Sequence, residues 1–169
     1  MPAVPHEVVL LEIPVDADFA DFRAEFERAV PRVDHERMEE IIDAGASWDE
    51  VEAIVAEKAT HDFMIYASLE GRPFSLAGHD PRCAMYLMGN HVIAERIYAH
   101  SPAALLYVPL RVALYVDSGE QTIFATDQPS TTLAGLRNAD ITAVGCELDQ
   151  KLAALLTALG VPPPQELRG

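Results

Sequence analysis

Four side chains in the most apolar part of the chain have the chemistry to bind or transform a small molecule. Asn90 and His91 follow an apolar run, Glu95 comes four residues after His91, and Arg111 stands alone inside a second apolar run. An arginine is seldom buried without a partner, so Arg111 requires an acid or a ligand anion. Asn90 and His91 would lie at the start of a helix, where backbone N–H groups favour anions. These features predict an anion site.

Two arrangements compete for these side chains. In the first, a pocket lies beside the Gly89-Asn90 turn, and Arg111 holds a small anionic ligand there. In the second, Arg111 closes on Glu95 in an internal ion pair, and Asn90 only caps the helix. Asp127 competes for Arg111 in both arrangements. The candidate ligand-binding residues are Asn90, His91, Glu95, Arg111 and Asp127.

A metal- or histidine-dependent enzyme is the alternative interpretation. His91 and Glu95 are four residues apart, so they share one face of a helix. A histidine can act as a general base near neutral pH. With His79 or His61, the pair could also offer nitrogen and oxygen ligands to a divalent transition metal, and no other cofactor is predicted. The sequence contains no glycine-rich phosphate loop, GxSxG motif or Rossmann fingerprint, so it leaves enzymatic activity open.

Composition limits the partners and the compartment. The 169 residues carry a net charge of −15, and half of them are hydrophobic. This acidic protein should repel nucleic-acid phosphates and anionic lipid, so we expect neither nucleic acid nor membrane as a partner. The two cysteines form no CxxC motif, which argues against a zinc ribbon. The N-terminus does not resemble a signal peptide, and no apolar run reaches the ~18 residues that span a bilayer. We therefore expect a soluble, cytoplasmic protein.

The hydrophobic pattern predicts strands and helices mixed along one chain. Strands are expected at 7–15, 61–69, 74–77, 83–88, 107–117 and 120–126, and helices at 18–29, 34–43, 47–58, 91–100 and 140–159. The run at 83–88 predicts a central strand buried on both faces, and Pro109 predicts a sheet edge or a bulge.

The resulting fold class is α+β. We expect a mostly antiparallel sheet of about four to six strands, with helices packed on one face. Residues 1–169 should form a single domain, with a helical insertion near 33–58 and a loose tail after 160.

Several short sequence motifs in the second half of the chain resemble those of a known family. They are Gly89-Asn90, Ile93-Ala94-Glu95, Ser101-Pro102, Tyr107, Pro109-Leu110-Arg111, Asp127, Pro129-Ser130, Leu148-Asp149 and Lys151. In order and spacing they resemble the bacterial "domain of unknown function 302" family over residues 86–156. Two features depart from the family pattern. His91 stands where many members have proline, and the segment 33–58 is longer and more helical than the usual start.

The resemblance implies a small α+β domain that is often dimeric and has no settled activity. We therefore expect a homodimer, to which Tyr107, Tyr115 and the strand edges would contribute an apolar patch. For function, the sequence favours an uncharacterised small-ligand or anion-binding module with its pocket near the Gly89-Asn90 turn and Arg111.

Overall fold

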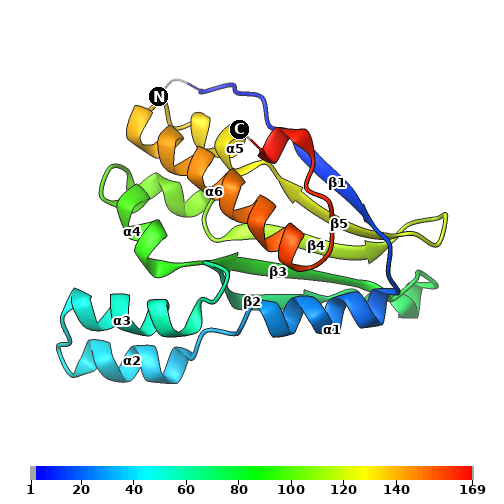
Figure 1. The fold of residues 1–169 in the computed structure, drawn as a ribbon, viewed down its shortest axis with the longest axis horizontal. Helices are drawn as coiled ribbons and strands as arrows, with labels where there is room; N and C mark the ends of the chain where they lie inside the picture. Colours follow the sequence, from blue (N-terminus) through cyan, green and yellow to red (C-terminus); the bar gives the residue numbers. More distant parts are fainter. Residues whose placement is uncertain (1–2, 169) are drawn as a thin grey trace.

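Most strands of the protein alternate buried and more exposed side chains, so each covers a core on one face. The structure, a computed structural model, describes residues 3–168. Its five strands form one antiparallel sheet in the order β1-β5-β4-β3-β2 (Figure 1). They are β1 (Leu10–Val15), β2 (Met64–Glu70), β3 (Cys83–Gly89), β4 (Leu110–Val116) and β5 (Thr122–Asp127). The predicted α+β class with a mostly antiparallel sheet is confirmed.

The helices begin where the sequence offers capping side chains. Asp18 and Asn138 each accept backbone N–H bonds, and Ser47 with Glu50 forms a capping box. The α-helices are α1 (Phe19–Ala29), α2 (His35–Asp43), α3 (Trp48–Lys58), α4 (His91–Tyr98), α5 (Pro129–Ala134) and α6 (Ala139–Ala158). Three short 3-10 helices are η1 (Arg72–Ala77), η2 (Pro102–Leu106) and η3 (Gln165–Leu167). Within residues 3–168, no helix has the length and apolarity needed to cross a bilayer.

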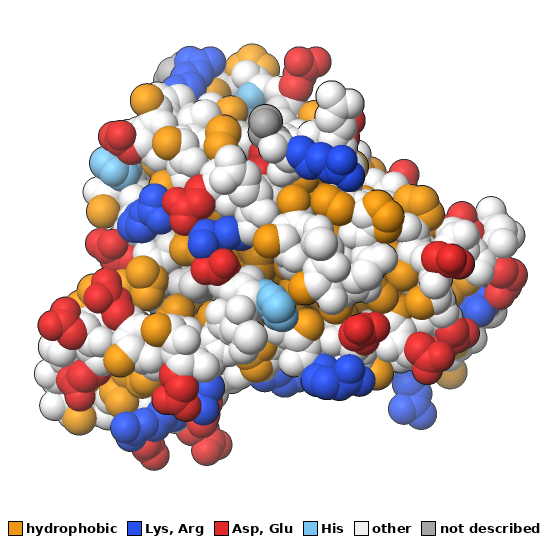
Figure 2. Space-filling view, in the orientation of Figure 1, with side chains coloured by type: hydrophobic (Ala, Val, Ile, Leu, Met, Phe, Trp, Pro, Cys, Tyr) orange, Lys and Arg blue, Asp and Glu red, His pale blue; other side chains and the backbone are white. Residues whose placement is uncertain are grey.

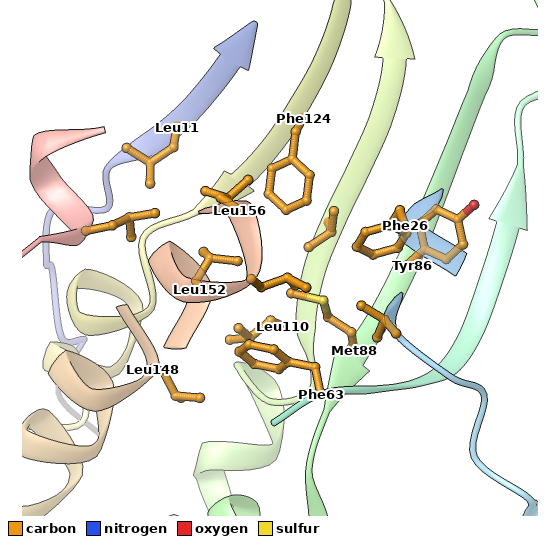
Figure 3. Close-up of a cluster of buried hydrophobic side chains, with 14 of the residues drawn as sticks. Leu11, Phe26, Phe63, Tyr86, Met88, Leu110, Phe124, Leu148, Leu152 and Leu156 are labelled. Atoms are coloured by element: carbon orange, nitrogen blue, oxygen red, sulfur yellow. The ribbon is translucent and has the colours of Figure 1, made fainter. Parts of the chain in front are cut away.

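One face of the sheet carries the main core. Phe26 of α1 is fully buried between Tyr86 of β3 and Phe124 of β5, with ring centroids 5.0 and 6.1 Å away. Leucines of α6, among them Leu152 and Leu156, join the same cluster (Figure 3). Ile93 and Ile97 bring α4 onto this face as well. The prediction of helices packed on one face is confirmed.

A second, smaller core lies at one end of the molecule. The helices α2 and α3 form a hairpin there, at the lower left of Figure 1. Ile41 of α2 and Val51 and Val55 of α3 pack around Val33 and Met64. Met64 is the first residue of β2, so this cluster fastens the hairpin to one edge of the sheet. The segment near 33–58 is helical, as the sequence predicts.

Two strand predictions were wrong. Residues 74–77 form part of η1 and not a return strand, and β2 pairs with β3. The Arg72-Pro73 start favours a helical turn, because proline has no N–H for a ladder but suits a first helical position. The run at 83–88 is not buried on both faces, since only alternate residues of β3 are fully buried.

Two predictions about chain position also need correction. Pro109 lies just before β4, the middle strand of the sheet, and not at an edge. The bulge-like register shift occurs in β2 between Ile65 and Ala67. The described part of the tail is not loose, because Val161 and Leu167 are buried against the main core.

Candidate functional site

At the corner between β3 and α4, the Asn90 side chain is used mainly for hydrogen bonds within the protein. Asn90 is only 8% exposed, and its Oδ1 accepts hydrogen bonds from the backbone N–H groups of Val92 (2.8 Å) and Ile93 (3.2 Å). Its Nδ2 donates to the carbonyl of Asp62 at 3.1 Å. The cavity beside it has a volume of about 20 Å³ and an apolar lining. That volume suits one water at most, so this corner has no room for a ligand.

Arg111 lies on β4 with its side chain on the sheet face that points away from the main core. It is 62% exposed and pairs with Asp127, with Nη2 and Oδ2 2.9 Å apart. The expected Arg111–Glu95 pair is not formed, and the competing Asp127 pairing is the one observed. The corner cavity includes Asn90 but none of the other four candidate residues, which therefore do not share it.

His91 packs against Tyr66 and is partly buried. Its ring lies 5.0 Å from that of Tyr66, and its Nδ1 is buried without a protein hydrogen-bond partner among residues 3–168. His35 bonds the Tyr66 carbonyl through Nε2 at 2.8 Å. In the same described range, no three His, Cys, Asp or Glu side chains gather as a metal would require. A metal held by His91, Glu95 and His79 stays a prediction.

The surroundings of His91 make protein stability depend on pH. Burial, and secondarily the nearby His35, lower the pKa of His91 below its usual 6.5. As the pH falls through 6.5, the unfolded chain takes up a proton that the folded protein does not. We therefore expect full stability above this pH, and a loss below it that ends once the folded site is protonated. Melting temperatures between about pH 8 and about pH 5 should fall less in His91→Gln than in the wild type. The exposed His79→Gln should behave like the wild type, and an equal fall in all three proteins would contradict the expectation.

A larger cavity lies elsewhere, between the α2–α3 hairpin and the sheet. Its volume is about 380 Å³, within the range of small-molecule sites. Its apolar part comes from Val33, Met38, Ile54 and Met64. Its charged lining is Arg32, Asp34, Arg37, Glu57 and Lys58. We call this cavity the hairpin pocket.

Local interactions fix the walls of the hairpin pocket. Asp34 caps α2 by accepting the backbone N–H of Arg37 at 2.9 Å, which places both side chains at the start of that helix. Lys58 ends α3 and lies 2.8 Å from Glu57, and Arg37 lies 3.2 Å from Glu40. All of these ion pairs are largely exposed, so the cations keep access to solvent and to a ligand.

The charge of the hairpin pocket contrasts with that of the chain. Three of the chain's 12 lysines and arginines line it, against two acids, Asp34 and Glu57. The lining therefore carries +1 in a protein of −15. Along the lower border of Figure 2, beneath α2 and α1, lysines and arginines lie in separate groups, and those near α2 have acidic side chains among them. None of the residues that line the hairpin pocket is among the candidates predicted from the sequence, although the basic residues Arg32, Arg37 and Lys58 near the two ends of the segment 33–58 are a signal that could have indicated them.

The comparisons with known proteins agree with this fold. The family model for Domain of unknown function DUF302 matches residues 45–159. A crystal structure of an uncharacterized conserved protein DUF302 from Bacillus stearothermophilus is similar, with a TM-score of 0.61 and 12% sequence identity. The match covers 88% of this chain and 95% of that chain, and at such low identity it shows the fold alone. No curated protein matches the sequence. Because the family match spans more than half of the chain, this protein belongs to the family Domain of unknown function DUF302.

Proposed function

We propose that this protein is a small-ligand-binding module and that the hairpin pocket takes a small amphipathic anion. The observation that carries the proposal is a cavity of about 380 Å³ that joins an apolar floor to a cationic rim in an acidic protein. The corner at Gly89 and Asn90 is a poorer choice, since its cavity measures about 20 Å³. The anion-binding role expected for this chain is thus assigned to a different place in the fold.

The lining indicates which ligands suit the pocket. Val33, Met38, Ile54 and Met64 offer apolar surface, which a hydrocarbon or aromatic group can cover. Arg32, Arg37 and Lys58 lie around it and favour a negative head group. The two acids among them disfavour multiply charged ligands, because a lining of +1 compensates one negative charge better than several. A monocarboxylate with a short apolar tail has these properties.

Octanoate is a suitable probe, and the methionines report where it binds. Met38 and Met64 line the hairpin pocket, Met88 is buried in the main core, and Met85 lies on the opposite sheet face. We expect octanoate to shift the methyl NMR signals of Met38 and Met64 while leaving those of Met85 and Met88 unchanged. Octylamine, which has the same number of carbons and a positive head, should bind much more weakly.

A charge substitution provides the matched control. Arg37→Glu should weaken octanoate binding by about tenfold, since it turns an attraction at the rim into a repulsion. Arg72→Glu makes the same change on the exposed η1, away from the pocket lining, and should leave the affinity unchanged. Absence of any shift at Met38 and Met64 with octanoate in millimolar excess would refute the proposal, as would equal weakening by both variants.

A further inference from the structure

The two edges of the sheet, β1 and β2, differ in how they are protected. In paired antiparallel strands, the backbone groups of alternate residues point to opposite sides. On β1, the Gln128 N–H bonds the Val9 carbonyl, so Val9 faces β5. Alternation then turns Leu10, Glu12 and Pro14 outward. Because proline has no N–H for an added strand, the β1 edge is protected against further strand pairing.

The β2 edge lacks this protection. The Gly71 N–H bonds the Cys83 carbonyl at 2.7 Å, so Gly71 faces β3. Leu69, two residues earlier, faces β3 as well, and Ser68 and Glu70 on either side of it point outward. Within residues 3–168, the backbone N–H and C=O groups of Ser68 and Glu70 have no hydrogen-bond partner. This part of β2 contains neither proline nor lysine.

The chain itself covers only the beginning of the β2 edge. The Ile65 N–H donates to the Pro31 carbonyl at 2.8 Å, and the Ile65 carbonyl accepts the Val33 N–H at 2.9 Å. These bonds form a short parallel bridge, after which the chain turns into α2. The bridge shows that this edge accepts backbone hydrogen bonds from a neighbouring segment. Residues 67–70 continue the edge without such a neighbour.

The side chains along residues 67–70 indicate what an added strand should carry. On the sheet face away from the main core, Ala67 and Leu69 are exposed, Leu69 by 64%. On the other face, Arg32 Nη2 lies 3.2 Å from Ser68 Oγ. The Arg32 side chain is 54% exposed and its ion pair with Glu27 is long, at 3.8 Å, so it keeps donors for another acid. An added strand would therefore meet apolar surface on one face and an arginine on the other.

We infer that the β2 edge binds an extended segment of a partner protein in which an acidic residue stands between two apolar ones. The N–H and C=O groups of Ser68 and Glu70 supply the main-chain hydrogen bonds from which strand addition gains affinity. The residue opposite Ser68 lies on the same face as Arg32 and pairs with it as an acid. Its two neighbours lie on the other face, beside Ala67 and Leu69. One acid suits the site better than several, because the protein carries −15.

Neither edge of a second copy of this chain fits the β2 edge as well. The β1 edge of a second copy would bring Pro14, which cannot donate. The β2 edge of a second copy would bring Glu70 as its acid, but this carboxylate already pairs with Arg23 of its own chain at 2.6 Å. Edge pairing would also bring together two chains of −15. A segment of a different protein therefore suits this edge better.

A pair of short peptides tests the inference. The first is Thr-Val-Glu-Val-Thr, with fluorescein at its N-terminus and an amide at its C-terminus, and the second has Lys in place of Glu. We expect the Glu peptide to bind about tenfold more tightly in fluorescence polarisation, because only it can pair with Arg32. In NMR spectra, it should shift the amide signals of Ser68 and Glu70 and slow their hydrogen exchange. The outward amide of Leu10 on β1 should not change.

Two variants locate the peptide on the β2 edge. Ser68→Pro removes an N–H that has no partner within residues 3–168, so the fold should persist by circular dichroism while peptide binding weakens by at least tenfold. Leu10→Pro makes the same change on the β1 edge and should bind the peptide as the wild type does. Arg32→Gln should bring the Glu and Lys peptides to similar affinities, and it decides the question even if Ser68→Pro fails to fold. Octanoate should still shift Met38 in Ser68→Pro, which separates this edge from the hairpin pocket.

Four results would overturn the inference. They are unchanged Ser68 and Glu70 amides with the Glu peptide in millimolar excess, equal affinity of the wild type for both peptides, equal weakening by folded Ser68→Pro and Leu10→Pro, and an unchanged preference for Glu over Lys in Arg32→Gln. Light scattering adds a check on the occupant. If Ser68→Pro lowered the mass of the protein without peptide, a second copy would occupy the edge, and the inference would also fail.

Discussion

Phe26→Ala is expected to lower the free energy of unfolding by about 4 kcal/mol, since a buried phenylalanine leaves a cavity on truncation. Phe26 is one of three buried phenylalanines by which α1 packs on the main core, and its ring lies 5.0 Å from Tyr86 and 6.1 Å from Phe124. All three side chains are fully buried. A loss of this size is a large share of the stability of an ordinary domain. Urea unfolding monitored by circular dichroism measures it.

Two further substitutions separate packing from simple loss of an aromatic group. Phe26→Leu fills most of the space and should cost about 1–2 kcal/mol. Phe74→Ala removes a phenylalanine that is 63% exposed on η1 and should change stability by no more than about 0.5 kcal/mol. If Phe26→Ala cost as little as Phe74→Ala, α1 would not be docked as described.

Asp149→Ala is expected to cost about 3 kcal/mol, because charge-assisted hydrogen bonds inside a protein contribute about 1.5–3 kcal/mol each. Asp149 is 5% exposed on α6. Its Oδ1 accepts the backbone N–H of Ser130 at 3.0 Å, and its Oδ2 accepts the Gln128 amide at 2.9 Å. It therefore holds the start of α5 against α6. Thermal and urea unfolding should both report the loss.

The neighbours of Asp149 supply its control. Gln150→Ala changes an exposed residue of the same helix and should be nearly neutral. Asp149→Asn keeps one acceptor oxygen and should fall between the wild type and Asp149→Ala. Equal stability of Asp149→Ala and Gln150→Ala would show that α5 is held by packing alone.

Several residues of the motifs that carry the family resemblance have structural roles. Asn90 caps α4, Asp149 supports Ser130, and Lys151 forms an ion pair with Asp62 at 2.8 Å. Capping positions of this kind can be predicted from the sequence because they depend only on residues close to one another in the chain. Capping needs particular side chains at fixed offsets from a helix start, and the chain shows them at Asp18, Ser47 and Asn90.

The errors in the fold come from context that the sequence does not contain. An apolar run such as 83–88 fits a strand buried on both faces or a strand beside an uncovered apolar surface. These two cases differ in whether helices cover one face of the sheet or both, and the residues of the strand itself do not determine this. Residues 74–77 have strand-like composition, but the preceding Arg72 and Pro73 and the short span to β3 favour η1.

The candidate site was harder to predict because its parts are distant in sequence. The hairpin pocket joins residues 32–38, 54–58 and Met64, which meet only after α2 and α3 have packed on β2. Arg111 is a candidate from the sequence because it is the one charged residue in an apolar run. Strand alternation instead points it to the sheet face opposite the main core, where Asp127 is its neighbour on the next strand.

The hairpin pocket lies across the boundary of the family match. The family match begins at residue 45, in the connection between α2 and α3. One wall, residues 32–38, therefore precedes the matched range, and the other wall, with Ile54 and Lys58, lies inside it. Under the proposed ligand-binding function, changes in the first wall would alter the size or charge of the ligand that fits, without touching the range that the family model matches. The proposed ligand preference of this chain would thus depend partly on residues that lie outside the family match, namely 32–38.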